Sequence, residues 1–225
     1  MTHMHEKRAV LYADEHLLVL DKPTGLLCVP GRGPDKADCL SARAKALYPD
    51  ALIVHRLDMA TSGLVVMGRG ALAQRTLSLA FAERRVHKRY EAVVAGVPDV
   101  SGADAEGWSD IRLPLIVDWP NRPKSKVDFE IGKPSHTRWR LLQVHDVPGL
   151  GPCARLALEP VTGRSHQLRV HLLALGHPML GDDLYAEGAA LAASPRLLLH
   201  ACAITLPHPH TGQTLSWTSP APFSA

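Results

Sequence analysis

The sequence predicts an α+β fold built on a mostly antiparallel sheet. Short apolar runs recur along the chain, and many neighbouring runs are joined by only a few turn residues. Strands connected in this way pair antiparallel, because a parallel connection needs a crossover of a dozen residues or more. Helical patterns are few and stand between the strands. With 225 residues, of which 46% are hydrophobic, the chain can bury one large core.

The N-terminal part of the chain predicts a hairpin followed by a helix. The apolar runs at 10–13 and 17–21 flank three polar residues, a pattern typical of a hairpin. A Lys-Pro-Thr-Gly turn follows, and 30–34 is a second, glycine-rich loop. That loop lacks the Gly-Lys-Ser/Thr ending of a phosphate-binding loop, which disfavours nucleotide binding. Residues 38–47 predict a helix capped by its first residue, Asp38.

The middle of the chain predicts a strand, a helix and another strand. The run Leu-Val-Val-Met at 64–67 indicates a buried strand. A helical pattern covers 71–84, with Leu72, Leu79 and Ala80 expected on its inward face. The apolar run at 91–95 then predicts the next strand.

The C-terminal part predicts a long hairpin, one helix and two final strands. The runs at 137–145 and 154–158 flank a turn rich in glycine and proline. The segment 165–175 predicts a helix that begins at a capping serine and ends at a glycine. A long strand is expected at 196–206, and a turn leads from it into a last strand that ends near Trp217.

Composition excludes several classes of protein. The formal net charge of +3 and the pI of about 8.7 fit a nucleic-acid partner without requiring one. Four scattered cysteines without a Cys-x-x-Cys pair, and 13 histidines without a His-Glu-x-x-His motif, argue against a metal site or a disulfide framework. No leader-like segment and no run of about 18 apolar residues is present. We therefore expect a soluble, cytoplasmic protein without a membrane segment, metal or cofactor.

Asp58 is the first candidate for chemistry. It follows Arg56 by two residues and precedes Ala-Thr-Ser-Gly, small residues that favour a tight, hydrogen-bonded loop. A carboxylate on a rigid loop near a cation stays ionised and can be aimed. From this stretch alone the alternative is a turn-capping acid that pairs with the neighbouring arginine.

Two basic clusters are candidates for binding phosphate. The first lies at the end of the predicted helix 71–84 and the second lies near Trp119. A solvated helix end is the alternative for the first cluster, because cations are favoured at a helix C-terminus in any case. Tyr90 follows the first cluster, and an aromatic residue at the start of a strand is usually part of the core. The clusters consist of Arg84, Arg85, Lys88 and Arg89, and of Arg122, Lys124 and Lys126.

Five motifs, in order along nearly the whole chain, resemble the RluA family of RNA pseudouridine synthases. The loop His-Arg-Leu-Asp-Met-Ala-Thr-Ser-Gly that contains Asp58 carries most of the resemblance. The segment Asp-Trp-Pro-Asn-Arg-Pro-Lys at 118–124 and the short N-terminus resemble one branch in particular, which acts on both 23S rRNA and tRNA. The other four motifs are KPTGL at 22–26, KRY at 88–90, TGRSHQLRVH at 162–171 and GHPMLGD at 176–182.

The resemblance implies roles for individual residues. Asp58 would be the catalytic carboxylate, Tyr90 would help the base lose its C5 proton, and Arg164 would face the carboxylate and hold it ionised. Arg56 would occupy the space left when the target uridine is flipped into the pocket. The sequence does not choose between attack at C1′, removal of the 2′ proton and addition to C6 as the first step. The predicted RNA contacts are Arg56, Arg84, Arg85, Lys88, Arg89, Arg122, Lys124, Lys126 and Arg169.

The resemblance also implies the architecture and the partner. We expect one pseudouridine synthase catalytic domain over 1–225, without an N-terminal S4-like module, containing a mixed, mostly antiparallel sheet with flanking helices and a central RNA-binding cleft. The expected partners are stem-loops of rRNA, of tRNA such as the anticodon arm, or of both, and the expected state is a monomer.

Two rival functions remain. An RNA N-glycosylase would normally need a second carboxylate, and residues 55–70 contain no acidic residue other than Asp58. An RNA-binding protein without chemistry would not need Asp58, Tyr90 and Arg164 together.

Overall fold

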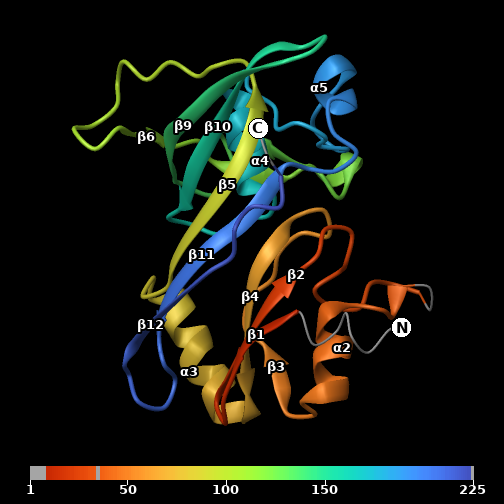
Figure 1. Cartoon of the computed structure of the whole chain (residues 1–225), viewed down its shortest axis with the longest axis vertical. Coiled ribbons are helices and arrows are strands. Elements are labelled where there is room, and N and C mark those ends of the chain that lie inside the picture. The colour runs from red at the N-terminus through yellow and green to blue at the C-terminus, as the bar shows by residue number, and fades with distance from the viewer. Residues whose placement is uncertain (1–8, 34–35, 224–225) are drawn as a thin grey trace. The chain divides into compact units, whose positions relative to one another are not determined.

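The computed structural model describes residues 9–33 and 36–223, which form two compact units (Figure 1). Unit 1 comprises the chain up to Lys88 together with Ala201–Ala221, and unit 2 comprises Arg89–His200 with the C-terminal residues. Two strands, β5 (His87–Ala95) and β11 (Leu199–Pro207), each contribute residues to both units. The single catalytic domain expected from the sequence stays a prediction, and each unit is described by itself.

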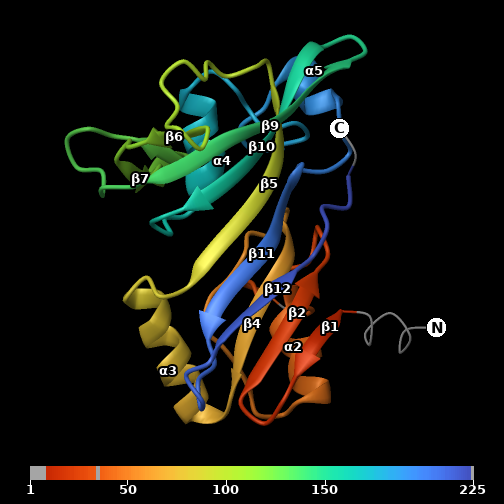
Figure 2. The same cartoon turned by 60° about the vertical axis from the view of Figure 1, so that its left-hand side comes forward.

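Unit 1 is a sheet with two helices (Figures 1 and 2). The order of its main strands is β1, β2, β4, β11 and β12, with β3 beside β4. The pairs β1–β2, β2–β4, β3–β4 and β11–β12 are antiparallel, which confirms the predicted N-terminal hairpin. Besides β11, the elements are β1 (Val10–Ala13), β2 (Leu17–Lys22), α2 (Leu40–Leu47), β3 (Ala51–Ile53), β4 (Ser62–Arg69), α3 (Gly70–Ala82) and β12 (Thr214–Thr218).

The core of unit 1 lies between α3 and the strands β2, β4 and β11. The helix turns Ala73, Leu77 and Ala80 inward, whereas Leu72 and Leu79 are 79% and 51% exposed. The predicted inward face was therefore confirmed for Ala80 and wrong for both leucines. The reason is a close approach of helix to strand: a Cβ added to Gly68 of β4 would lie 2.6 Å from the Gln74 nitrogen. At this approach the helix presents Ala73, whose small side chain fits, and the face of Ala73 also carries Leu77 and Ala80.

Unit 2 contains a four-stranded antiparallel sheet in the order β5, β10, β9, β6. A separate hairpin of β7 and β8 has the short 3-10 helix η2 (Trp119–Asn121) at its tip. The helix α4 packs against β8, β9 and β10, and Figures 1 and 2 show it beside β9 and β10. The remaining elements are β6 (Trp108–Ile111), β7 (Leu115–Val117), β8 (Ser125–Val127), β9 (Thr137–Val147), β10 (Gly151–Pro160), α4 (Gln167–Ala174) and α5 (Gly188–Ala192).

Both predicted helix caps were wrong. Helix α2 begins at Leu40 with Cys39 as its N-cap, and the carboxylate of Asp38 instead accepts hydrogen bonds of 2.8 and 2.7 Å from the Arg43 guanidinium. Helix α4 begins two residues later than predicted, after His166. His166 is left-handed, with a φ of 55°, and a local fold of this kind is set by tertiary contacts that a capping pattern does not report.

Strand boundaries also differ from the predicted ones. Strand β5 begins at His87, before Tyr90, and β11 begins at Leu199 rather than at Arg196. The chain before β11 makes a turn in which the Ser194 hydroxyl donates a 2.7 Å hydrogen bond to the Arg196 carbonyl. The antiparallel pairing predicted from the apolar runs is otherwise confirmed. In the described part of the chain, no helix is both long enough and apolar enough to span a membrane.

Candidate active site

The loop that carries Asp58 connects β3 to β4 in unit 1 and is held by the turn that follows β2. Lys22, at the end of β2, has no exposed surface, and its Nζ donates hydrogen bonds to three backbone carbonyls. Two belong to its own turn, at Pro23 (2.9 Å) and Leu26 (2.7 Å), and the third is that of Met59 at 3.0 Å. The ammonium therefore ties the turn to the residue directly after Asp58.

Two further hydrogen bonds join the same turn to the loop. The Thr24 hydroxyl donates to the Ala60 carbonyl at 2.7 Å, and the Gly25 nitrogen donates to the Met59 carbonyl at 2.9 Å. The loop also closes on itself, because the Thr61 nitrogen donates to the Asp58 carbonyl at 3.2 Å. The backbone after Asp58 is thus fixed by two sets of contacts.

The backbone before Asp58 is held by a cysteine. The Leu57 nitrogen donates to the Cys28 sulfur at 3.2 Å, and both residues are buried. Burial raises the pKa of the Cys28 thiol, which keeps it protonated at neutral pH. Since Leu57, Met59 and Ala60 are all anchored, the direction of the Asp58 side chain is set by the loop around it.

His55 ties the start of the loop to β4. Its Nε2 accepts a 2.9 Å hydrogen bond from the Val66 nitrogen, and its ring stacks on Phe81 of α3 with the centroids 4.6 Å apart. Burial lowers the pKa of His55 to about 3, and the nearby positive charge of Lys88 lowers it further in the same direction. A neutral ring is required here, because Nε2 accepts a hydrogen bond only when it carries no proton.

This arrangement predicts a pH dependence of stability. Between pH 6.5 and 3 the imidazole of His55 binds a proton in the unfolded chain but not in the folded one. His55 therefore makes its full contribution to the free energy of unfolding above pH 6.5. This contribution decreases as the pH falls, by up to about 1.4 kcal/mol per pH unit. A His55→Gln variant keeps an acceptor and does not titrate. Urea unfolding at pH 7 and pH 5 should show the wild type losing about 2 kcal/mol more than the variant. Equal losses would contradict the neutral ring.

Gly63 fixes the far end of the loop. Its φ of 110° is open to glycine and costly for other residues, and an added Cβ would lie 2.4 Å from the Ala201 carbonyl oxygen. Both residues belong to unit 1. The glycine therefore lets the start of β4 lie directly against β11, and the loop that carries Asp58 ends at this contact.

Arg164 lies in unit 2, in the exposed turn before α4, and Gln167 organises that turn. The Gln167 Oε1 accepts hydrogen bonds from the Thr162 hydroxyl at 2.7 Å and from the Arg164 nitrogen at 3.1 Å. Its Nε2 donates to the His136 carbonyl at 2.9 Å and to the Thr137 hydroxyl at 3.0 Å. The buried amide thus holds the backbone of Arg164 to the start of β9 and leaves its guanidinium at the surface.

Tyr90 also belongs to unit 2. It lies in β5 opposite Leu158 of β10 and is 8% exposed. Asp58, in contrast, belongs to unit 1. The structure therefore brings each of the three predicted catalytic residues into an ordered local setting, and their action on one uridine belongs to the proposal below.

The predicted RNA contacts differ in their surroundings. In unit 1, Arg56 and Arg84 are exposed, whereas Arg85 pairs with Glu83 at 2.7 Å. Lys88 is half-buried, and burial lowers the pKa of its ammonium. In unit 2, Arg89 pairs with Glu159 at 2.8 Å. Exposed arginines are the ones available to phosphate without breaking an ion pair.

Arg169 has a structural setting instead. Its guanidinium is 2% exposed and donates to both carboxylate oxygens of Asp182, with the Nε bond at 2.8 Å. Asp182 is equally buried and also accepts from the Leu184 and Tyr185 nitrogens, at 3.0 and 3.2 Å. A guanidinium enclosed in this way does not face RNA, so we remove Arg169 from the predicted contacts. On the predicted helix Arg169 falls off the face shared by Leu168, Leu172 and Leu175, so the pattern gave no sign of its burial.

Several residues of these networks were not predicted as site residues, among them Lys22, Gln167 and Tyr185. Lys22 follows the apolar run 17–20 and Asp21, so the local pattern predicts a turn residue and not a buried side chain. Gln167 and Tyr185 act through partners far away in the sequence, and a local pattern does not reveal such contacts.

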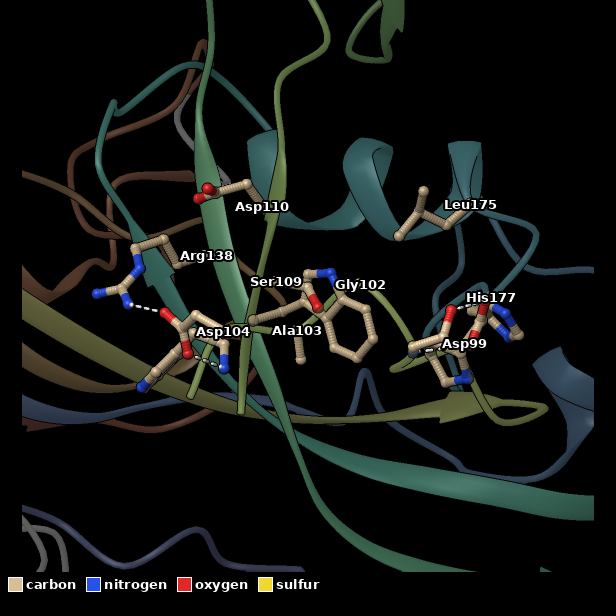
Figure 3. Close-up of a pocket in the computed structure, with 13 residues that line it drawn as sticks. Asp99, Gly102, Ala103, Asp104, Ser109, Asp110, Arg138, Leu175 and His177 are labelled. Carbon is tan, nitrogen blue, oxygen red and sulfur yellow. Dashed lines mark hydrogen bonds and ion pairs between the residues drawn. The ribbon is translucent and has the colours of Figure 1, made fainter. Parts of the chain in front are cut away.

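A pocket of about 710 Å³ lies elsewhere in unit 2 (Figure 3). Its wall comes from 98–110, β9 and the end of α4, and it includes Arg138, whose guanidinium lies 3.3 Å from the Asp104 carboxylate. None of Asp58, Tyr90 and Arg164 lines it. The carboxylates of Asp99, Asp104 and Asp110 also make it unsuited to a phosphate backbone. Among the described residues, no group of three His, Cys, Asp or Glu side chains is arranged to hold a metal ion.

Comparisons with known proteins test the resemblance. A family model described as RNA pseudouridylate synthase matches residues 16–174. The dual-specificity RNA pseudouridine synthase RluA of Escherichia coli O6:H1 is 50% identical over 214 residues, covering 95% of this chain and 93% of the relative. The protein of the same description from Haemophilus influenzae is 42% identical, with the same coverage of both chains.

Solved structures agree with the family. Human RNA pseudouridylate synthase domain containing 1 has a TM-score of 0.77 at 28% identity, covering 96% of this chain and 84% of that one. Human RNA pseudouridylate synthase domain containing 4 has a TM-score of 0.72 at 25% identity, covering 97% and 90%. The predicted fold class and the predicted family are both confirmed. The chain belongs to the RNA pseudouridylate synthase family.

Proposed function

We propose that this chain converts a specific uridine of structured RNA to pseudouridine, with Asp58 as the carboxylate that acts on the flipped nucleotide. The observation that carries this role is the anchoring of Leu57, Met59 and Ala60 on both sides of Asp58. A side chain that only caps a turn does not need its neighbours fixed by a buried lysine, a threonine and a cysteine. A carboxylate that must meet one atom of a bound substrate does.

The reaction is an isomerisation and needs no oxidant or reductant. The N1–C1′ bond breaks, the base turns, C5 bonds to C1′, C5 loses its proton and N1 gains one. One carboxylate is sufficient for each of the three possible first steps, which are attack at C1′, removal of the 2′ proton and addition to C6. In every case the positive character that develops on the sugar is stabilised by a nearby negative charge.

Arg164 and Tyr90 complete the proposed site, so that one catalytic domain includes both units. An arginine that faces Asp58 keeps the carboxylate ionised and fixes its orientation through paired hydrogen bonds, which a lysine does less well. The turn organised by Gln167 supports this role because it holds the Arg164 backbone while leaving its side chain exposed. Arg56, also exposed, would enter the space vacated by the flipped base.

The role of Tyr90 gives a separate prediction. A Tyr90→Phe variant keeps the ring in the sheet and loses only one hydroxyl. Its free energy of unfolding should therefore lie within about 1 kcal/mol of that of the wild type. If the hydroxyl helps C5 lose its proton, the rate should fall by roughly a hundredfold or more while RNA affinity is kept. Single-turnover conversion of a stem-loop and its dissociation constant measure the two effects. A wild-type rate in a folded Tyr90→Phe protein would leave this residue as part of the core.

The proposed substrates are stem-loops of 23S rRNA and of the tRNA anticodon arm. Two curated relatives carry the description dual-specificity RNA pseudouridine synthase, and they match nearly the whole chain. Stem-loops present splayed bases, the part of an RNA that proteins read most readily. Exposed Arg56 and Arg84, together with Arg122 and Lys124 of the β7–β8 hairpin, would contact phosphates of such RNA. We propose that the enzyme acts as a cytoplasmic monomer.

A map of pseudouridines tests this function. Total RNA from cells that lack the chain is incubated with the purified protein, and pseudouridines are mapped before and after. We expect new pseudouridine at a uridine in 23S rRNA, in tRNA anticodon arms, or in both. Release of free uracil would indicate the N-glycosylase, and RNA binding without any new base would indicate a protein without chemistry. Either result would overturn the proposal.

A further inference from the structure

The tip of the β7–β8 hairpin presents an aromatic ring to solvent. Trp119 is 68% exposed and lies in η2, at the turn between the two strands. The turn around it is well defined, because the Asp118 nitrogen donates to the Lys124 carbonyl at 2.9 Å and the Lys124 nitrogen donates to the Asn121 carbonyl at 3.0 Å. The Asn121 amide also donates to the Asp118 carboxylate at 2.9 Å. A large ring on an ordered turn contributes little to the core and is open to contact with another molecule.

Arg122 covers one face of this ring. The central carbon of its guanidinium lies 3.8 Å from the ring centroid of Trp119, so the two planar groups form one unit. In the part of the chain that the structure describes, neither Arg122 nor Lys124 is paired with a carboxylate. The tip therefore combines an aromatic surface with positive charge, which is the combination that binds single-stranded nucleic acid.

A tyrosine fixes this hairpin to the turn of Arg164 within unit 2. The Tyr185 hydroxyl accepts a 2.7 Å hydrogen bond from the Ser125 nitrogen of β8 and forms another of 2.7 Å with Nδ1 of His166. The Lys124 ammonium lies 6.0 Å from the centre of the Tyr185 ring. Because His166 is two residues from Arg164, this tyrosine joins the hairpin to the turn that carries the arginine.

We propose that Trp119, backed by Arg122, is a stacking platform for one unpaired base of the substrate RNA other than the uridine that is converted. The inference rests on the proposed function for its substrate. It assigns to the hairpin the selection of stem-loops whose loop offers a second splayed base at the right distance from the target. Every base has an aromatic face, so the platform recognises the position of a splayed base rather than its identity.

RNA is favoured over a protein partner by the composition of the tip. One ring flanked by an arginine and a lysine fits a base and its phosphates, whereas a protein interface needs a larger apolar area around its central aromatic residue. Phe129 of the same unit provides a control, since it is 78% exposed and no cation is stacked on it within the described residues. Removing Phe129 should leave RNA binding unchanged.

The experiment combines protein variants with abasic RNA. A stem-loop of the tRNA anticodon arm that the wild type binds is prepared as a series in which each loop nucleotide in turn lacks its base but keeps its sugar and phosphate. Dissociation constants are measured for the wild type, Trp119→Ala, Trp119→Phe and Phe129→Ala. The wild type should bind roughly tenfold to a hundredfold more weakly when one particular base other than the target is missing. Trp119→Ala should bind the intact RNA equally weakly and be indifferent to the loss of that base. Trp119→Phe should bind nearly as the wild type does.

Two results would overturn the platform. The first is that the affinity of Trp119→Ala changes at every abasic position as that of the wild type does. The second is that Trp119→Ala binds intact RNA with wild-type affinity, which would indicate that the exposed ring binds a protein partner instead. Both leave pseudouridine formation by the wild type untouched, so the proposed function would stand. Conversely, if the wild type binds the series as expected but forms no pseudouridine, the platform stands and the proposed function falls.

Discussion

A Lys22→Met variant is expected to lose both stability and activity, although residue 22 touches no substrate. Methionine has about the length of lysine, but it removes the Lys22 donor from the carbonyls of Pro23 and Leu26 and leaves the Met59 carbonyl with the Gly25 nitrogen alone. Unsatisfied polar groups out of reach of water cost about 1–3 kcal/mol each, so we expect unfolding to become easier by about 3 kcal/mol. The loop after Asp58 would then be tied to the turn after β2 only by the Thr24–Ala60 and Gly25–Met59 hydrogen bonds.

The loss of activity should exceed the loss of folded protein. Small displacements of a reacting group lower rates steeply, and we expect conversion per folded molecule to fall roughly a hundredfold. Urea unfolding gives the stability, and single-turnover conversion below the unfolding transition gives the rate. Lys45→Met on α2, which removes an exposed lysine of the same unit, is the matched control and should change neither. A Lys22→Met protein with wild-type stability and rate would show that the buried ammonium does not position the loop.

The sequence predicts most of the fold because its strands are local features. Apolar runs at β2, β4, β9 and β10 stand out against polar turns, and each pairs with a neighbour a short distance along the chain. The start of helix α4 was predicted less well. There the left-handed His166 is set by its contact with Tyr185, 19 residues away. A capping pattern considers four residues at a time and does not include such a contact.

In the candidate site, too, local motifs were predicted from the sequence and contacts between distant segments were not. Asp58, Tyr90 and Arg164 were found because motifs name residue types in order, and the family they indicated is confirmed. The buried side chains around them were not predicted. Lys22 reads as part of a turn, and its burial follows from three carbonyls that converge only in the folded chain. Arg169 reads as a surface cation, and its burial follows from Asp182, which is equally buried. Motifs report which residues are present, whereas burial depends on the packing of distant segments.

The most direct test of the account is the Asp58→Asn protein. Asparagine keeps the size of the side chain and the backbone hydrogen bond from Thr61 to residue 58, but it removes the negative charge. Attack at C1′, removal of a proton and stabilisation of positive charge all need that charge, so single-turnover pseudouridine formation should fall at least about a thousandfold. Binding of the stem-loop should be kept or become tighter, because one negative charge leaves a site that receives an anion. If Asp58 only capped a turn, unfolding would become easier by about 0.5–2 kcal/mol and activity would fall only as far as folding did. A folded, RNA-binding Asp58→Asn protein that forms pseudouridine at a rate near that of the wild type would contradict the central role of this carboxylate.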